Sequence, residues 1–518
     1  MRWLGIDLGA ERIKVAEVVE DGGALSLGRA WVREHGQNPA GTLLDILAEA
    51  RWDETDGAAA TGRMATMVRM PRIPLKAAVS EGMALVHPGI SPFVVAIIGA
   101  HGFAVVEGRG GGDCLVRENS RCSQGTGNFL RQLVGRFGWT PAEADRLCDP
   151  VQDPSPLSGR CPVILKTDMT HLANRGERRE RVLAGLYDAV CENVEALLPT
   201  VNPPAYLVLA GGVTRSERIR RRFRRTAERL GMSFVEPDPE GRDEALEAFG
   251  AAVHAARHAV PRPRLEEVVV PAVRTPFERR PAPREALHRV EFLPANPCPA
   301  PDRDRAVVLG LDIGSTGSKA VAVDVEHRTP VWSSYRATLG DPVGAARGLV
   351  QAFQEQAGSR CRVLAIAVTG SGREIAGTLA TTCYGADRVH VMNEIAAHAA
   401  GARHQDPEVD TIFEIGGQDA KYIRLDGGRV VDAAMNEACS AGTGSFIEEQ
   451  GRALAGSPDI RQLGELALRA RESLSLGQHC SVFMAEVIEQ AVAAREPLEA
   501  IVAGIYDSVV QNYLHRVK

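Results

Sequence analysis

The chain has 518 residues, which is long enough for two or more domains with cores of their own. Apolar residues make up 44% and charged residues 24%, and the formal net charge of −6 gives no bias toward nucleic acid. No apolar run approaches the roughly 20 residues of a membrane span. The N-terminal stretch MRWLGIDLGAERIK meets acidic residues and glycine too soon for a signal peptide, so we expect a cytoplasmic protein.

Cysteine is too sparse for a disulfide scaffold, with ten residues over the whole chain. Six of the ten have no motif around them and are expected to be small apolar core residues: Cys114, Cys148, Cys191, Cys298, Cys361 and Cys383. The other four fall in segments that occur twice.

The chain contains an internal repeat. LGIDLGAERIKVA at residues 4–16 matches LGLDIGSTGSKAV at residues 309–321, and RCSQGTGNFL from Arg121 matches ACSAGTGSFI from Ala438. So many ordered matches predict a tandem duplication, in which each copy is one structural unit.

The spacing between repeated residues is also kept. Gly99 precedes Cys122 by 23 residues, and Gly416 precedes Cys439 by the same number. In the same way Cys161, in GRCPVILK, pairs with Cys480, in QHCSVFMA, and each lies 24 residues before the glycine of a matched AG(L/I)YD segment.

We therefore divide the chain into module one (residues 1–258), a linker (259–305) and module two (306–518). The linker mixes proline and arginine and is predicted to be semi-rigid and largely extended, with one short strand at 266–270. Module two stops about where module one has reached residue 199, so it lacks a counterpart of the last part of module one.

Each module begins with a strand, a glycine turn and a second strand. In module two the strand 307–312 is followed by Gly314 and by the strand 319–323, which predicts a β-hairpin and not the strand-to-helix turn of a P-loop. Inward-facing N–H groups at such a turn suit a phosphate, Ser315 and Thr316 add hydroxyl donors, and Asp312 suits a magnesium ion held through water.

Two further devices lie within residues 413–450. Gly416, Gly417, Gln418 and Asp419 end an apolar strand and suit a phosphate with its magnesium ion. Cys439 opens a glycine-rich turn before a predicted helix, which suits an anion or a metal–thiolate centre at the helix N-terminus. Together they indicate a nucleotide hydrolase coupled to a cysteine-ligated metal cluster.

The segments DIGSTGSKA, EIGGQDAK, MNEACSAGTGSF and CSVF resemble the activator ATPases of 2-hydroxyacyl-CoA dehydratases and benzoyl-CoA-reductase-type enzymes. The resemblance covers both modules and is closest to long fusions that carry two activator modules. It implies an α/β fold with two tandem ribonuclease-H-like modules, as in actin and the sugar kinases. It also implies that this chain is the N-terminal part of such a fusion.

In that family an activator homodimer holds one [4Fe–4S] cluster between its subunits, each giving two cysteines. ATP binding and hydrolysis drive low-potential electron transfer to the partner dehydratase or reductase. Carried over by motif, the cluster ligands here are Cys122, Cys161, Cys439 and Cys480. A tandem chain would then build the cluster within one polypeptide as a pseudo-dimer, or within a homodimer, and a ferredoxin or flavodoxin would supply the electron. The alternative is that the four cysteines are core residues.

The resemblance also assigns nucleotide contacts in module two. The residues expected to hold ATP and Mg²⁺ are Asp312, Gly314, Ser315, Thr316, Lys319, Gly416, Gly417 and Lys421. Gln418 is expected to orient the attacking water, and Asp419 to act as base or magnesium anchor. Glu394 and His398 share a predicted helix face, and a solvated face is an equal alternative to a role in the site.

Neither module carries every motif. Module one has Ala10 and Glu11 where module two has Ser315 and Thr316, and its second turn, GAHGF, lacks the glutamine and aspartate. It keeps Gly211–Gly212, which resembles the adenosine-binding turn and has no counterpart in module two. The sequence therefore leaves the ATPase activity of this chain open.

Two other functions stay open at this stage. One is a sugar-kinase-like phosphotransferase without a cluster, which would have no use for four matched cysteines. The other is a truncated, non-catalytic scaffold that binds the cluster without turning over ATP.

Overall fold

The computed structural model describes residues 1–36, 38–100, 102–110, 114–118, 126–157, 161–270, 277–292, 298, 304–436, 443–456 and 459–516. Cys122 and Cys439 lie outside these residues.

Module one begins with a four-stranded sheet in the order β3-β2-β1-β4. Its strands are β1 (Arg2–Leu8), β2 (Arg12–Asp21), β3 (Ala24–Glu34) and β4 (Gly57–Thr61). The residues of β1 from Trp3 onward are buried because both faces are covered, one by α8 (Leu246–Arg257) and the other by α1 (Pro39–Glu49). Helix α1 begins where Asn38 accepts from the Gly41 N–H, with proline at the first helical position.

The second sheet of module one has five strands in the order β7-β6-β5-β8-β9. They are β5 (Phe93–Ile98), β6 (Phe103–Gly108), β7 (Cys114–Glu118), β8 (Tyr206–Ala210) and β9 (Ser233–Phe234). The helices that accompany the two sheets are α2 (Leu75–Val86), α3 (Thr126–Arg136), α4 (Pro141–Cys148), α5 (Pro162–Asn174), α6 (Arg179–Glu195) and α7 (Glu217–Leu230).

Module two repeats the first part of this plan. Its five-stranded sheet has the order β13-β12-β11-β14-β15, with β11 (Arg305–Ile313), β12 (Gly317–Asp324), β13 (Pro330–Ala337), β14 (Cys361–Thr369) and β15 (Val389–Val391). The first three helices of module two are α10 (Pro342–Gln356), α11 (Arg373–Tyr384) and α12 (Glu394–Gln405).

The second sheet of module two is shorter, with strands β16 (Thr411–Ile415), β17 (Ala420–Asp426) and β18 (Arg429–Met435) in that order. Four helices follow: α13 (Gly444–Ala455), α14 (Ile460–Arg469), α15 (Ser481–Ala493) and α16 (Leu498–Arg516). In module one β5 pairs on its outer side with β8, whereas within the described residues of module two β16 pairs only with β17. The described residues of module two therefore present no counterpart of the Gly211–Gly212 turn.

The predicted α/β fold with two tandem modules is confirmed, and so are the predicted hairpins. The repeat holds at the level of residue pairs, since Asp7 faces Lys14 across β1 and β2 just as Asp312 faces Lys319 across β11 and β12. The repeated glycine turns fix where each hairpin reverses.

The linker differs from the predicted extended tract. The strand expected at 266–270 is wrong, because Leu265–Val268 form one turn of helix, α9, and Val268 is fully buried in the core of module one. Further on, β10 (Arg279–Pro281) pairs with β19 (Glu472–Leu474) of module two. The linker thus makes ordered contacts with both modules, whose boundaries stay predictions.

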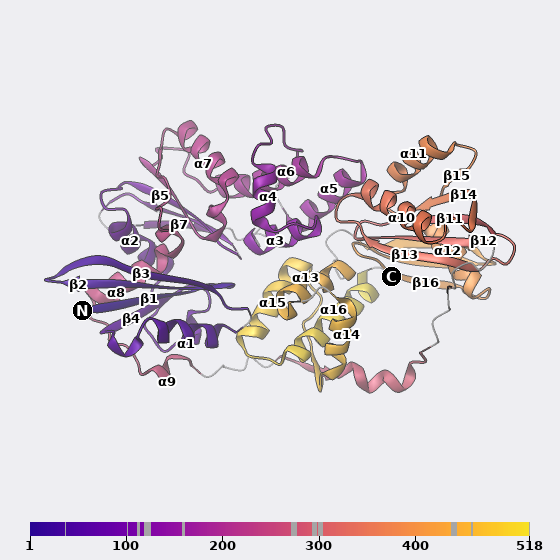
Figure 1. Ribbon diagram of the computed structural model, residues 1–518. Coiled ribbons are helices and arrows are strands. Elements are labelled where there is room, and N and C mark those ends of the chain that lie inside the picture. The colour runs from indigo at the N-terminus through magenta and orange to yellow at the C-terminus, as the bar shows by residue number, and fades with distance from the viewer. Residues whose placement is uncertain are drawn as a thin grey trace.

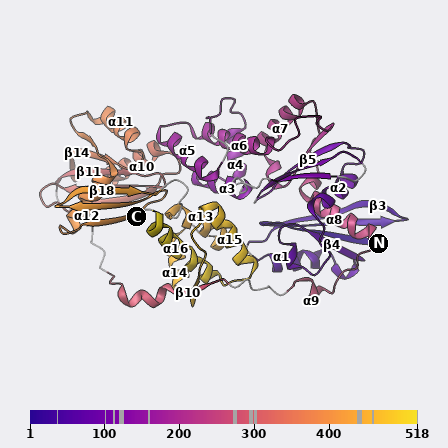
Figure 2. The same cartoon turned by 180° about the vertical axis from the view of Figure 1, so that it is seen from behind.

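The modules meet through their helices. In Figures 1 and 2 the sheets of module one lie at one end of the molecule and those of module two at the other. Helices α3–α6 and α13–α16 form two facing groups between them. Among the described residues, no helix is long and apolar enough to span a membrane.

Candidate functional site

The two predicted phosphate turns of module two lie against each other. A Cβ added to Gly417 would lie 2.3 Å from the Thr316 hydroxyl oxygen, so only a glycine allows this approach. The Thr316 hydroxyl is buried and has no hydrogen-bond partner among the described residues. A buried donor without a partner beside a glycine turn fits a bound phosphate oxygen, which would satisfy it.

Asp312 lies at the end of β11, next to the same turn. Its carboxylate lies 3.0 Å from the Lys319 ammonium, and both side chains remain partly exposed. Ser315, in the turn itself, is also partly exposed, and the Thr338 hydroxyl donates to the Gly314 carbonyl at 2.7 Å. Thr338 therefore holds the backbone of the turn, while the side chains of Asp312 and Ser315 stay accessible to a ligand.

Gln418 reaches across to module one. Its amide lies 2.9 Å from the Thr170 hydroxyl on α5. With the amide turned so that its oxygen accepts, it is also bonded to the guanidinium of Arg136 on α3. The residue expected to orient water is thus held by two helices of the other module.

Lys421 is surrounded by carboxylates. Its ammonium lies 2.5 Å from Glu394, 3.1 Å from Glu414 and 3.0 Å from Asp419, and only 3% of its side chain is exposed. Burial acts to lower the pKa of Lys421, but Glu394, Asp419 and Glu414 outweigh it and the pKa is raised. In this arrangement Lys421 positions carboxylates, including Asp419, and its predicted contact with phosphate stays a prediction. Glu394 and His398 are the pair predicted to share a helix face. The structure brings Glu394 into the group of carboxylates around Lys421.

The helix that follows each of the segments of Cys122 and Cys439 in sequence is bonded directly to the glycine turn of its module. In module two the N–H groups of Gly444 and Ser445, at the start of α13, donate to the carbonyls of Gly416 and Gly417 at 2.9 and 3.0 Å. In module one the Gly127 N–H, at the start of α3, donates to Gly99 and Ala100 at 3.1 and 3.0 Å. In both modules the N-terminus of this helix is therefore tied to the glycine turn by backbone hydrogen bonds.

A buried group of charges joins the modules beside this turn. Lys166 on α5 donates to Ser445 and Glu449 on α13, at 3.0 and 2.9 Å, and Arg136 lies 3.6 Å from Glu449. Burial lowers the pKa of both Lys166 and Arg136, while Glu449 opposes the shift. Lys166 and Ser445 lie within repeated segments, but the sequence assigned no role to either, and Arg136 and Glu449 lie outside those segments. No pattern in the sequence pairs these charges across the two copies.

Two of the four predicted cluster ligands, Cys161 and Cys480, lie in the described residues, each at the start of a helix in its own module. Cys161 is the N-cap residue of α5 and Cys480 is the N-cap residue of α15, both partly buried and free of disulfides. Helices α5 and α15 contact each other across the module boundary. Because Cys122 and Cys439 lie outside the described residues, the full ligand set is not assembled here, and no group of three metal-binding side chains occurs among the described residues.

Module one has a cleft of about 760 Å³ between its two sheets, within the range of small-molecule sites. Its walls include Gly9, Gly99, Gly127, Gly212 and Ser216, so the hairpin turn, the second turn and the predicted adenosine turn all face one space. Gly211 has φ +91°, and a Cβ there would lie 2.5 Å from the Ile98 carbonyl oxygen, so the turn requires glycine.

Ion pairs cross the mouth of this cleft. Glu11 pairs with Arg131 on α3, while Glu244 pairs with both Arg12 and Arg215. In the repeat, Glu11 stands at the position of Thr316. Module one thus has a carboxylate paired with Arg131 where module two has a hydroxyl with no partner among the described residues. The sequence gives no sign that Arg131 is the partner of Glu11.

Comparisons with known proteins agree with the repeated design. The model of the BadF/BadG/BcrA/BcrD ATPase family matches residues 4–253 and again 309–517. The 2-hydroxyisocaproyl-CoA dehydratase activator of Clostridioides difficile is 31% identical over 212 residues, covering 40% of this chain and 75% of that protein. The (R)-2-hydroxyglutaryl-CoA dehydratase activating ATPase of Acidaminococcus fermentans is 30% identical over 207 residues, with 40% and 75% covered.

Among solved structures, component A of the Acidaminococcus fermentans (R)-2-hydroxyglutaryl-CoA dehydratase aligns with a TM-score of 0.44 at 21% identity. It covers 50% of this chain and 99% of its own. Because the family model matches both copies and most of the chain, this protein belongs to the BadF/BadG/BcrA/BcrD ATPase family.

Proposed function

We propose that this chain is an ATP-dependent activator in which module two hydrolyses ATP and the two modules share one [4Fe–4S] cluster. The cluster would be held by Cys122, Cys161, Cys439 and Cys480. Its electron, supplied by a ferredoxin or flavodoxin, would pass to a dehydratase of 2-hydroxyacyl-CoA or a related reductase. Relatives named as activators of such dehydratases support this role.

One observation carries the proposal: the bonds from Gly444 and Ser445 to the carbonyls of Gly416 and Gly417. Gly444 lies only five residues after Cys439 in sequence, so the helix bonded to the turn suited to phosphate begins close to the proposed cluster ligand. A change at the bound phosphate would reach the helix next to the proposed cluster ligand through two hydrogen bonds.

The residues around the turns fit a nucleotide and Mg²⁺. The unpaired Thr316 hydroxyl and the glycine turns would donate to phosphate oxygens, and Asp312 would hold Mg²⁺ through water. Gln418 would orient the attacking water while Thr170 and Arg136 fix its amide, and Asp419 would take up the proton or anchor the metal. Mg²⁺ would neutralise the charge that develops on the phosphate.

The described cysteines fit a cluster on chemical grounds. Four thiolates complete a cubane cluster, and Cys161 and Cys480 both cap helix N-termini, whose dipoles favour the extra negative charge of a reduced cluster. The contact between α5 and α15 supports a site built within one chain.

The test begins with anaerobic iron and sulfide content after reconstitution. About four irons per chain are expected for an intramolecular cluster, and about two would indicate a cluster shared by two chains. The matched variants are Cys161→Ser with Cys480→Ser, which should lose iron, and Cys383→Ser, an exposed cysteine outside the motifs, which should keep it. Unchanged iron in the double variant would remove the cluster from the proposal.

Coupling is tested on the loaded protein. ATP with Mg²⁺ should change the EPR spectrum of the reduced cluster, and Asp312→Asn should abolish that change while leaving iron content intact. Full iron with neither ATP hydrolysis nor a spectral response would instead support the scaffold. The missing counterpart of Gly211–Gly212 within the described part of module two is the observation that favours this second function.

A further inference from the structure

The end of α3 in module one reaches the second phosphate turn of module two, residues 416–418. We call residues 135–138 the α3 end. With the Gln418 amide turned so that its oxygen accepts, the Arg136 guanidinium donates to it. In Figures 1 and 2, α3 lies at the centre of the molecule beside α13, the helix bonded to the same turn. Module one therefore contacts this turn through Arg136.

The next two residues of the α3 end pack on a different part of module two, the turn 338–341 between β13 and α10. A Cβ added to Gly340 would lie 2.4 Å from the Phe137 ring, so a side chain at this position would collide with the ring. A Cβ added to Gly138 would lie 3.3 Å from the Leu339 side chain. The backbone of this turn therefore rests on Phe137, and its leucine lies over Gly138.

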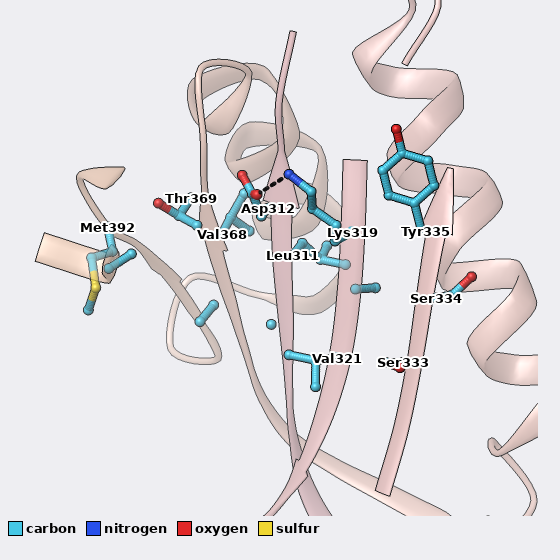
Figure 3. A pocket seen from close by; sticks show the side chains of 14 residues that line it. Leu311, Asp312, Lys319, Val321, Ser333, Ser334, Tyr335, Val368, Thr369 and Met392 are labelled. Carbon is cyan, nitrogen blue, oxygen red and sulfur yellow. Dashed lines mark hydrogen bonds and ion pairs between the residues drawn. The ribbon is translucent and has the colours of Figure 1, made fainter. Parts of the chain in front are cut away.

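The turn 338–341 is bonded in its own right to the first phosphate turn, at the tip of the β11–β12 hairpin. The Thr338 hydroxyl donates to the Gly314 carbonyl at 2.7 Å, and the Thr338 N–H donates to the Thr316 carbonyl at 2.9 Å. Below the tip, Asp312 and Lys319 bridge the two strands of the hairpin, as Figure 3 shows. The α3 end thus contacts the second phosphate turn directly and the first through one short turn.

The backbone at Leu339 indicates that this contact is required. Leu339 has φ +51°, in the left-handed region that favours glycine, and module one has Gly36 with φ +49° at the equivalent place. The two turns correspond, since His35 bonds to the hairpin tip of module one through its N–H as Thr338 does in module two. A leucine persists in this conformation only where its surroundings need the side chain.

The equivalent positions do not repeat these contacts in the opposite direction. Ala453 lies as far after Cys439 as Arg136 does after Cys122, and it has no guanidinium to offer. A Cβ added to Gly36 would meet nothing within 4 Å. Among the described residues at these positions, module one therefore supports the turns of module two without receiving the same support.

We propose that the α3 end is a spacer that fixes the distance between the two phosphate turns of module two, with Arg136 and Leu339 as positioning residues. Hydrolysis needs the phosphate, its magnesium ion and the attacking water in line, and groups on both turns would hold them. Module one is then a built-in activating subunit for module two. This inference rests on the proposed hydrolysis of ATP by module two and adds which part of module one it requires.

The first test replaces the strained leucine by the residue of module one. Leu339→Gly removes the contact with Gly138, but glycine accepts the backbone angle, so thermal stability should not fall. We expect kcat for ATP hydrolysis to fall about tenfold while KM changes by less than about twofold. Arg328→Gly is the matched control, since Arg328 is exposed and has φ +57° in the turn between β12 and β13. It should keep kcat, and an equal fall in both variants would overturn the proposal.

The second test asks whether Arg136 acts through Gln418. Arg136→Lys keeps a cation beside Glu449 but loses the planar guanidinium that bonds the amide, so kcat should again fall about tenfold. In a Gln418→Ala background the same substitution should have no further effect on kcat. Losses that multiply in the double variant would overturn the positioning role of Arg136.

A third measurement needs no ATP. In the free chain, amide hydrogen exchange should become faster at residues 313–318 in Leu339→Gly and at residues 415–420 in Arg136→Lys. It should stay unchanged at both segments in Arg328→Gly. Unchanged exchange in the first two variants would overturn the spacer. A chain that hydrolyses no ATP but shows the expected exchange would remove the proposed hydrolysis while the spacer stands.

Discussion

Lys166 donates to the Glu449 carboxylate at 2.9 Å across the module boundary, although 283 residues separate them in sequence. Both side chains are nearly buried, at 12% and 7% exposure. The pair ties α5, whose N-cap residue is Cys161, to α13, whose first two residues donate to the turn suited to phosphate. The two places that the proposed function must couple are thus linked by a charge pair shielded from solvent.

This pair leads to a stability prediction. Glu449→Gln leaves Lys166 and Arg136 buried without their carboxylate and should destabilise the protein by about 3 kcal/mol. Guanidinium denaturation followed by fluorescence and circular dichroism measures the change. Glu408→Gln, at an exposed position, should alter stability by less than about 0.5 kcal/mol. Equal effects of the two variants would show that the buried pair contributes nothing.

The contact between the Gln418 amide and Thr170 of module one leads to a prediction about the rate of ATP hydrolysis. Thr170→Val removes one hydrogen bond to the amide and should lower kcat for ATP hydrolysis by about fivefold with KM unchanged. Gln418→Ala should cost about tenfold to a hundredfold. Thr167→Val is the matched control, since the Thr167 hydroxyl donates to the Val163 carbonyl within α5 and, among the described residues, makes no bond to Gln418. A raised KM for Thr170→Val would assign Thr170 to binding and not to positioning.

Alkylation should distinguish the buried thiols of Cys148 and Cys191 from the accessible thiols of the predicted cluster ligands. Burial raises the pKa of Cys148 to about 12 and raises that of Cys191 well above its usual value, so neither supplies a thiolate near pH 8. Iodoacetamide should therefore label Cys161, Cys480 and Cys383 in the iron-free chain and spare the two buried thiols. After reconstitution Cys161 and Cys480 should be protected while Cys383 still reacts, as peptide mapping by mass spectrometry would show. Continued labelling of Cys161 in the loaded protein would argue against its role as a ligand.

The Glu11–Arg131 pair predicts that the cleft of module one gains affinity for nucleotide when the carboxylate is removed. Glu11→Thr copies the residue of module two and frees Arg131 for phosphate. Affinity for a fluorescent ATP analogue should rise about tenfold or more, because a hydrogen bond to a charged group contributes about 1.5–3 kcal/mol. The measurement is made in an Asp312→Asn background, which silences module two. Unchanged affinity would show that Glu11 does not keep phosphate out.

Two glycines at the same place in the first strand of each module should respond differently to an added methyl group. A Cβ added to Gly5 would lie 1.8 Å from the Ala248 carbonyl oxygen of α8. Gly5→Ala must push α8 from β1 and should destabilise module one by about 1–3 kcal/mol. Gly310→Ala meets only Val321 and should change stability by less than about 0.5 kcal/mol. Thermal unfolding of both variants tests the contrast, and equal losses would show that the contact with α8 does not decide the effect.

The backbone plan could be predicted from the sequence because it depends on local signals. Glycine turns between apolar runs fixed the hairpins at Asp7–Lys14 and Asp312–Lys319, and equal spacing between Gly416 and Cys439 and their counterparts fixed the repeat. The linker strand failed because Val268 is drawn into the core of module one, where a single helical turn buries it.

The contacts between modules were decided only by the tertiary structure. Lys166 with Glu449, and Thr170 with Gln418, belong to different copies, and no spacing in the sequence relates a helix of one copy to a turn of the other. Their partners depend on how the two groups of helices pack, which is set by the shapes of whole faces. The sequence by itself determined the modules and their turns, and the packing of the modules decided what holds those turns in place.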